Sequence, residues 1–136
     1  MSLKSYSVAV DTNGSVDIVQ GDLDDPACPT RQVIDRIGDK WSVLVILHLA
    51  GGELRFTELR ARVRGVTPKV LTRTLRALER DGLVSRRVYA EVPPRVEYAL
   101  TDLGVSLIGP LEVLRAWAEE KIPAIVRCRA RYDDVA

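Results

Sequence analysis

Residues 67–82 form the part of this chain whose local structure is most strongly determined. Thr67 is a preferred residue just before a helix, Pro68 suits the first helical position, and Gly82 fits just beyond a helix end. Three leucines share one face at helical spacing: Leu71, Leu75 and Leu78. The pattern predicts a short helix over 67–81 that buries its leucine face.

The opposite face of this helix is basic. At about 100° per residue, four cations project as a stripe roughly opposite the leucines: Lys69, Arg73, Arg76 and Arg80. A polyanion would suit this stripe, but a solvated basic face explains this helix alone equally well. The neighbouring elements therefore decide between the two interpretations.

A second short helix is predicted directly before the basic one. Phe56, Leu59 and Val63 stand at i, i+3 and i+7, and residues 64–66 follow as a tight turn that contains glycine. Two short helices joined by such a turn are typical of a helix-turn-helix.

The residues after the basic helix change to a strand pattern. Segment 83–90 is rich in β-branched and aromatic residues, and segment 95–100 alternates more cleanly between apolar and polar residues. Residues 91–94 connect them as a stiff tip, because their two prolines fix φ and cannot donate to a ladder. A helix-turn-helix followed by a basic β-hairpin is a winged helix, and this order favours nucleic-acid binding over a solvated face.

Charge is distributed unevenly along the 136 residues. Residues 1–30 carry a net charge of −4, while residues 53–95 contain eleven Lys or Arg and five acidic residues, in a chain of net charge +1. One basic block in a nearly neutral chain indicates a local binding face. No run approaches the ~20 apolar residues of a membrane span, and the N-terminus lacks a signal-peptide pattern, so we expect a cytoplasmic protein without a membrane partner.

The N-terminal part is less constrained. In residues 1–27, segments 7–10 and 15–20 flank an Asn-Gly turn, which predicts either a small β-hairpin or a mobile arm. Cys28-Pro29 begins a helix that Gly38-Asp39 interrupts. The almost wholly apolar run 41–49 predicts a buried helix.

A long last helix is predicted from Thr101-Asp102 onward, with leucines and Trp117 near helical spacing. Pro110 should bend or restart this helix, and Pro123 should break it. The chain is thus expected to be mainly α with a small β-hairpin wing. We predict an extension over 1–27, a winged helix-turn-helix domain over 28–122, and a tail over 123–136.

This order of motifs resembles the HxlR family, a MarR-like branch of bacterial winged-helix transcription regulators. The resemblance runs from Cys28 to about Trp117 and rests on motifs in matching order and spacing: Cys28-Pro29, Ile37-Gly38-Asp39-Lys40-Trp41, Arg55-Phe56, Glu58-Leu59, Thr67-Pro68-Lys69, Leu71, Leu75-Arg76, Leu78-Glu79, Gly82-Leu83-Val84, Arg87, Pro93-Pro94-Arg95-Val96, Tyr98, Leu100-Thr101 and Gly104. Asp39 replaces the glycine usual before Lys-Trp, and Val66-Thr67 stands where Ile-Ser is commoner. The resemblance implies dimerisation through the N-terminal and long C-terminal helices, and repression more often than activation.

We therefore predict a homodimeric, sequence-specific regulator that binds double-stranded DNA at a pseudo-palindromic operator. Helix 67–81 would lie in the major groove, with its first turns nearest the base edges. Base or near-base contacts are predicted for Lys69, Thr72 and Arg73, because arginine can bond guanine through two parallel hydrogen bonds. Arg80, late in the helix, is as consistent with a surface residue as with a contact.

The remaining predicted contacts go to the DNA backbone. Thr67, Arg76 and Arg55 are expected to hold phosphates, and the helix start at Pro68 can itself bind one. Arg87 and Arg95 would bring the wing to the backbone or the minor groove.

Cys28 is the candidate regulatory residue. If Pro29 is the first helical residue, the Cys28 thiol lies at the positive end of the helix, which favours the reactive thiolate. The resemblance implies sensing of a small electrophile or oxidant, because several family members do this through a cysteine in this position. An inert cysteine beside the dimer interface is the alternative.

Other function classes remain open. A winged helix can be a protein-interaction module without DNA, although the four-cation stripe argues against it, and a non-covalent ligand could replace the cysteine as the switch. No enzyme, metal or cofactor is predicted, since the chain has one histidine, no Ser/His/Asp pattern, no glycine-rich phosphate loop and no CxxC.

Overall fold

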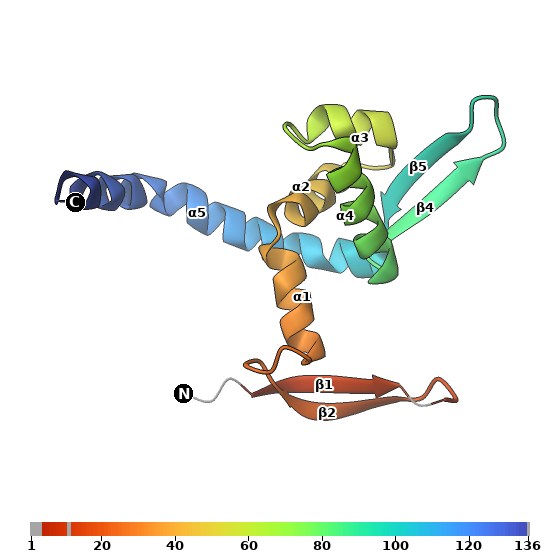
Figure 1. Ribbon diagram of the computed structural model, residues 1–136, viewed down its shortest axis with the longest axis horizontal. Coiled ribbons are helices and arrows are strands. Elements are labelled where there is room, and N and C mark those ends of the chain that lie inside the picture. Colours follow the sequence, from red (N-terminus) through yellow and green to blue (C-terminus); the bar gives the residue numbers. More distant parts are fainter. Residues whose placement is uncertain (1–3, 11, 136) are drawn as a thin grey trace. The chain divides into compact units, whose positions relative to one another are not determined.

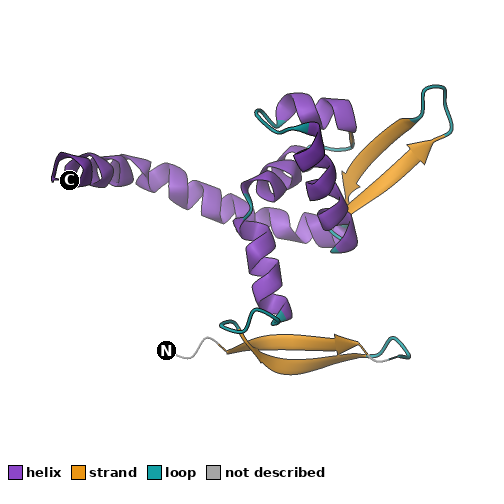
Figure 2. Ribbon diagram, viewed as in Figure 1, coloured by secondary structure: helices purple, strands orange, loops and turns teal. Residues whose placement is uncertain are grey.

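The computed structural model describes residues 4–10 and 12–135, and the chain divides into two compact units, Met1–Val43 and Leu44–Ala136. Two separate antiparallel sheets accompany the helices (Figure 2). In chain order the elements, labelled in Figure 1, are β1 (Lys4–Val10), β2 (Val16–Asp22), α1 (Pro29–Gly38), α2 (Lys40–Leu49), β3 (Leu54–Arg55), α3 (Phe56–Arg62), α4 (Pro68–Arg80), β4 (Val84–Tyr89), β5 (Arg95–Leu100) and α5 (Asp102–Val135).

The first unit contains a hairpin followed by a helix. Strands β1 and β2 pair antiparallel from Lys4 opposite Asp22 to Val10 opposite Val16. Of the two structures predicted for this segment, a β-hairpin or a mobile arm, the structure has the hairpin. Asp11, at the start of the predicted turn, lies outside the described residues. Helix α1 begins at Pro29, as expected for a proline at the first helical position.

Asp39 separates α1 from α2 and caps the second helix. Its carboxylate accepts a hydrogen bond from the Trp41 backbone N–H at 3.4 Å and one from the Ser42 hydroxyl at 2.9 Å. A side-chain oxygen at this position satisfies donors that a helix start leaves without partners. The departure from the family's glycine therefore has a structural role here.

In the second unit α3 and α4 form the predicted helix-turn-helix. Leu71, Leu75 and Leu78 of α4 are at most 1% exposed, so the leucine face is the buried one. Thr67 accepts a hydrogen bond from the Val70 backbone N–H at 3.2 Å, which caps the start of α4. At the other end Gly82 adopts a φ of +76°, a conformation that glycine tolerates without steric cost.

Strands β4 and β5 form the wing. They pair from Val84 opposite Leu100 to Tyr89 opposite Arg95, with residues 90–94 as the tip. The short strand β3, which sequence reasoning did not predict, pairs with β5 and makes it the central strand of three. The predicted winged helix-turn-helix fold is confirmed.

The last helix corrects one prediction. Helix α5 runs without interruption over 34 residues, with Pro110 and Pro123 inside it, so the predicted break at Pro123 is wrong. The start of α5 lies tightly against the segment between α4 and β4, because a Cβ on Gly104 would stand 2.1 Å from the Leu83 carbonyl oxygen. The close approach at Gly104 therefore fixes where α5 leaves the helix-turn-helix and the wing, residues 54–100, which together are called the reading head below.

Candidate nucleic-acid interface

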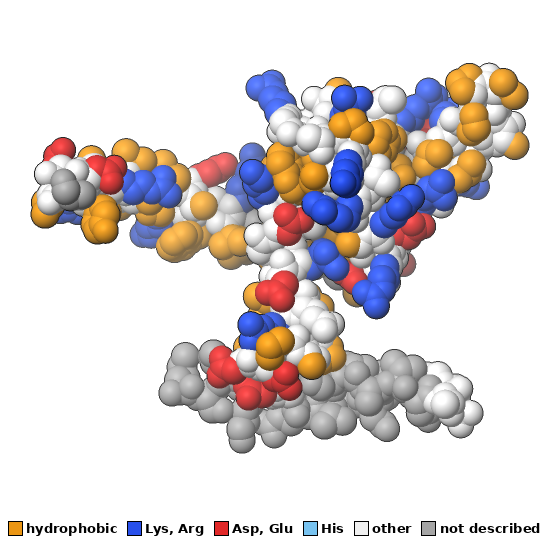
Figure 3. All heavy atoms as spheres, viewed as in Figure 1, with side chains coloured by type: hydrophobic (Ala, Val, Ile, Leu, Met, Phe, Trp, Pro, Cys, Tyr) orange, Lys and Arg blue, Asp and Glu red, His pale blue; other side chains and the backbone are white. Residues whose placement is uncertain are grey.

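Helix α4 presents its basic face to solvent. Lys69, Arg73, Arg76 and Arg80 are all exposed, opposite the buried leucines. Within the described ranges none of these four side chains takes part in an ion pair, so their charges are not neutralised by the protein. Figure 3 shows Lys and Arg side chains gathered over α4 and along the β4–β5 hairpin.

A hollow follows the exposed side of α4. It has a volume of about 450 Å³ and is lined by five of the predicted site residues: Pro68, Lys69, Thr72, Arg73 and Arg76. Pro68 begins the helix and Thr67 caps it, so the predicted base-contact and phosphate-contact residues of α4 share one surface. A surface of this kind offers cations and hydroxyls to an anionic ligand.

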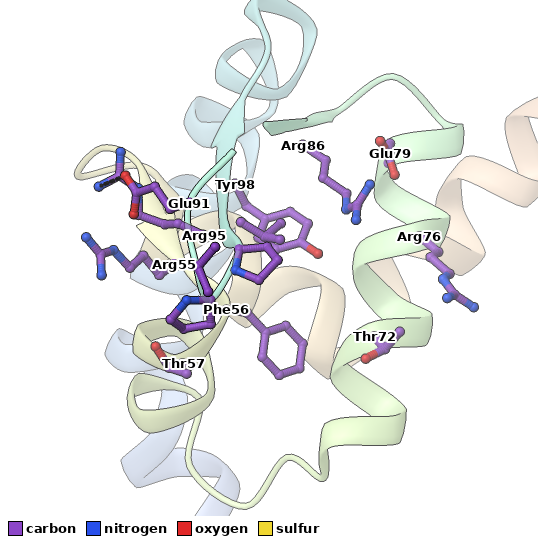
Figure 4. Close-up of a pocket in the computed structure, with 14 residues that line it drawn as sticks. Arg55, Phe56, Thr57, Thr72, Arg76, Glu79, Arg86, Glu91, Arg95 and Tyr98 are labelled. Atoms are coloured by element: carbon purple, nitrogen blue, oxygen red, sulfur yellow. Dashed lines mark ion pairs between the residues drawn. The ribbon is translucent and has the colours of Figure 1, made fainter. Parts of the chain in front are cut away.

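A second, larger groove lies between the helix-turn-helix and the wing. It has a volume of about 790 Å³, and its lining includes Arg55, Thr72 and Arg76 together with Arg86 of β4 and Tyr98 of β5. In Figure 4 these side chains come from α4 on one side and from the wing and the start of α3 on the other. The groove therefore continues the basic surface of α4 toward the wing.

Arg86 is a residue of this groove that sequence reasoning did not select. Strand alternation supplies the signal that finds it: Val84 is buried, and the side chain two positions further along lies on the same face of the strand. Arg87, which was selected, lies on the opposite face, and its guanidinium is 5.4 Å from the centre of the Tyr89 ring.

Arg95 borders the groove, but its guanidinium is engaged within the wing. Its Nε lies 3.3 Å from Glu97 Oε1, and its Nη1 lies 3.4 Å from Glu91 Oε1. The Nε contact is an ion pair and not a hydrogen bond, because this buried atom has no aligned acceptor among the described residues. The guanidinium also stacks 4.1 Å from the centre of the Tyr89 ring.

Arg55 begins the other side of the same cluster. Its Nε is 4.0 Å from Glu97 Oε1, and its backbone N–H donates to Glu58 Oε1 at 3.1 Å. The second contact caps α3, since Glu58 is the third residue of that helix. Arg55 remains half exposed, so it borders the groove while it contacts Glu97.

Cys28 belongs to the first unit. It precedes Pro29 as the helix cap of α1, as predicted, but its side chain makes no capping hydrogen bond and is 3% exposed. Cys128 on α5 is exposed, and Arg131 Nη2 donates to its sulfur at 3.4 Å.

In the described ranges no group of three His, Cys, Asp or Glu could hold a metal ion. No helix within the described residues is long and apolar enough to cross a membrane.

Comparisons with known proteins agree with this geometry. A protein of Methanothermobacter thermautotrophicus named as an HTH-type transcriptional regulator is 47% identical over 96 residues, which cover 71% of this chain and 73% of that protein. The structure of the transcriptional regulator YtfH from Salmonella typhimurium is 38% identical, has a TM-score of 0.75, and covers 81% of this chain and 98% of its own.

A third similar structure is described as the redox regulator HypR in its reduced form. It is 37% identical, with a TM-score of 0.68, and the match covers 73% of this chain and 98% of that one. The relatives are named as transcriptional regulators, and no catalytic function is indicated. The family model described as HxlR-like helix-turn-helix matches residues 36–125, a range that does not include Cys28. The chain belongs to this HxlR-like family of helix-turn-helix transcriptional regulators.

Proposed function

We propose that the protein is a homodimeric, sequence-specific DNA-binding regulator that acts in the cytoplasm on a pseudo-palindromic operator. The observation that carries this proposal is the exposed face of α4, where four cations form no ion pair with any described residue and a hollow follows the same side of the helix. The phosphates of DNA supply the negative charge that would neutralise these cations. The family membership supports the same function.

The contacts follow from the position of each residue along α4. Lys69, Thr72 and Arg73 lie on the first two turns, the part of a reading helix that comes nearest the base edges, so we assign them to base recognition. Thr67 and the helix start at Pro68 are assigned to a phosphate, as are Arg76 and Arg55 at the rim of the groove. For the wing, the sequence predicts backbone or minor-groove contacts by Arg87 and Arg95, and of these two Arg95 borders the groove.

Dimerisation is supported by apolar side chains that each unit leaves exposed. On α1 these are Val33 and Ile34, each about half exposed, and on α5 they include Val113, Leu114 and Trp117. Large exposed apolar patches mark interaction sites. A two-fold dimer would place the two copies of α4 about one DNA turn apart, ~34 Å. We assign DNA binding and dimerisation to residues 28–122, and repression as the mode of action.

The test is fluorescence anisotropy with a labelled duplex from the region upstream of the protein's own gene, at several salt concentrations, with a scrambled duplex as control. We expect affinity for the upstream duplex to exceed that for the scrambled one by ~1,000-fold or more, with a steep salt slope. Equal, salt-sensitive binding to both would place the operator elsewhere. Absence of binding to either duplex at low salt would refute the proposal and favour a protein-interaction module.

We also propose that modification of Cys28 by an oxidant or electrophile switches DNA binding. The similarity to a redox regulator supports this, as does the position of Cys28 directly before the first residue of α1. Because the thiol is buried, its reaction requires local opening of the first unit. Cys28→Ser should retain DNA affinity and lose the response to a quinone or diamide. An equal response in the variant would point to Cys128 or to a non-covalent ligand.

A further inference from the structure

The three arginines of the wing do not face the same way. Successive side chains of a strand point to opposite faces, so Arg86 shares a face with its register partner Tyr98, which is buried against the body of the unit. Arg87 lies opposite Glu97, and Arg95 lies opposite Tyr89, on the other face. The wing thus has an inner face, which carries Arg86 and Tyr98, and an outer face, from which Arg95 still reaches the rim of the groove.

Arg86 is the wing arginine whose charge is available on the inner face. It is exposed, and no described residue forms an ion pair with it. It lines the groove together with Thr72 and Arg76 of α4, and Figure 4 shows its side chain between the wing and that helix. A phosphate held by Arg76 in this groove would lie on the surface that Arg86 also faces.

Arg95 differs because carboxylates of the protein already neutralise its charge. Two carboxylates neutralise its guanidinium, Tyr89 covers one side of it, and the side chain is only 27% exposed. Binding a phosphate would require it to leave these partners. A planar guanidinium between two carboxylates and an aromatic ring is typical of a residue that fixes local structure.

Glu97 connects this arrangement to the helix-turn-helix. Its Oε1 faces Arg95 of the wing on one side and Arg55 on the other, and Arg55 lies in β3 directly before α3. Because β3 pairs with β5, the wing and the first helix of the motif meet at this carboxylate. The cluster is suited to hold the wing at a set angle to the reading head.

We propose that Arg86 makes the wing's contact with the DNA backbone, and that Arg95 and Glu97 are positioning residues that hold the wing. This inference rests on the proposed DNA binding and assigns its wing contact to a different residue. Arg87, on the same strand but the opposite face, provides a matched control of equal charge.

The first experiment measures the salt dependence of binding to a mixed-sequence duplex, because phosphate contacts do not depend on sequence. Loss of one phosphate contact lowers the slope of log affinity against log salt by about 0.9, which amounts to about 8-fold weaker binding at 0.1 M salt relative to 1 M. For Arg86→Gln we expect the salt slope to fall by this amount for each protomer bound. For Arg87→Gln we expect a smaller change in the slope. Equal effects of the two variants would overturn the assignment.

The second experiment asks whether removing the Glu97 charge strengthens or weakens DNA binding. Removing a negative charge beside DNA strengthens binding if the charge does nothing else, whereas loss of a positioning carboxylate weakens it. We expect Glu97→Gln to weaken binding about fivefold, as for a part-exposed ion pair at the upper end of its usual range. We expect Arg95→Lys to weaken binding similarly although it keeps the charge, because lysine cannot reproduce the stacked, two-carboxylate arrangement.

Melting followed by circular dichroism would establish that each variant is folded at the assay temperature. Stronger binding by Glu97→Gln, or unchanged binding by Arg95→Lys, would overturn the positioning role. If wild-type protein binds neither this duplex nor the upstream duplex at low salt, the proposed function itself fails. If wild-type protein binds and Arg86→Gln binds with the same slope, only the assignment of Arg86 fails.

Discussion

Replacement of Gly104 by alanine should strongly destabilise the second unit. The added Cβ would stand 2.1 Å from the Leu83 carbonyl oxygen and 3.1 Å from its carbon, although real Cβ contacts are essentially never closer than 3.0 Å. One backbone segment must therefore move by about 0.9 Å. That oxygen also accepts a hydrogen bond from the Thr101 N–H at 3.1 Å, which the movement would weaken.

The size of the effect follows from three contributions. Overpacking against rigid backbone costs about 3 kcal/mol, at the upper end of its usual range. The weakened hydrogen bond adds about 1 kcal/mol. Alanine offsets about 1 kcal/mol through its better helix propensity. Gly104→Ala should therefore lower the free energy of unfolding by about 3 kcal/mol.

Urea unfolding followed by circular dichroism measures this change, at one fixed protein concentration because a dimer's stability depends on concentration. With a slope of about 1.5 kcal/mol/M, the midpoint should fall by roughly 2 M. Gly109→Ala is the matched control, since it lies in the same helix and its added methyl group would meet nothing within 4 Å, and it should gain up to about 1 kcal/mol. A Gly104→Ala midpoint within about 0.3 M of wild type would refute the steric argument.

Three further predictions concern other parts of the molecule. Asp39→Ala should lower the free energy of unfolding by about 1 kcal/mol through loss of the cap on α2. Asp39→Asn should keep most of the stability of wild type, because asparagine also caps a helix start, and urea unfolding measures both variants. Arg73→Ala should weaken binding to the upstream duplex by about 1–3 kcal/mol and narrow the difference from the scrambled duplex, whereas Arg80→Ala should not, both measured by anisotropy. Single-cysteine variants that retain either Cys28 or Cys128 should differ in labelling by a thiol reagent, with the exposed Cys128 much the faster; equal rates would show that the first unit opens readily.

The helix-turn-helix was predictable because its determinants are local. Thr67 caps the helix that follows it, three leucines mark the buried face, and Gly82 ends the helix in a conformation few other residues adopt. Each signal lies within one turn of the structure it specifies. The residues that line the hollow on α4 follow from the same periodicity, once the leucine face is known to be buried.

The path of the last helix was not predictable from single residues. Each proline removes one backbone hydrogen bond and crowds the preceding turn, a local cost of about 3 kcal/mol that argues for a break. The residues between Pro110 and Pro123 are mostly good helix formers, and Arg115 pairs with Glu112 and Glu119 at helical spacing. Helix propagation across the whole segment outweighs the local cost.

The arrangement of the wing depends on pairing between distant segments. Charge alone suggested Arg95 as a DNA contact, and its engagement by Glu97 is apparent only when β5 pairs on both sides. Strand β3 has just two residues, Leu54 and Arg55, which is too short to leave a period-2 pattern. The pairing of β3 with β5, which brings Arg55 to Glu97, therefore has no local signal in the sequence.

The close approach at Gly104 also constrains the length of α5. This contact fixes the helix to the reading head at one end, and the proposed dimer surface around Trp117 lies further along the same unbroken helix. An inserted residue between the two points would turn everything beyond it by about 100° and advance it by about 1.5 Å. Relatives that share this dimer can therefore exchange side chains on the exposed side of α5, but they cannot gain or lose single residues there without turning both reading heads away from their half-sites.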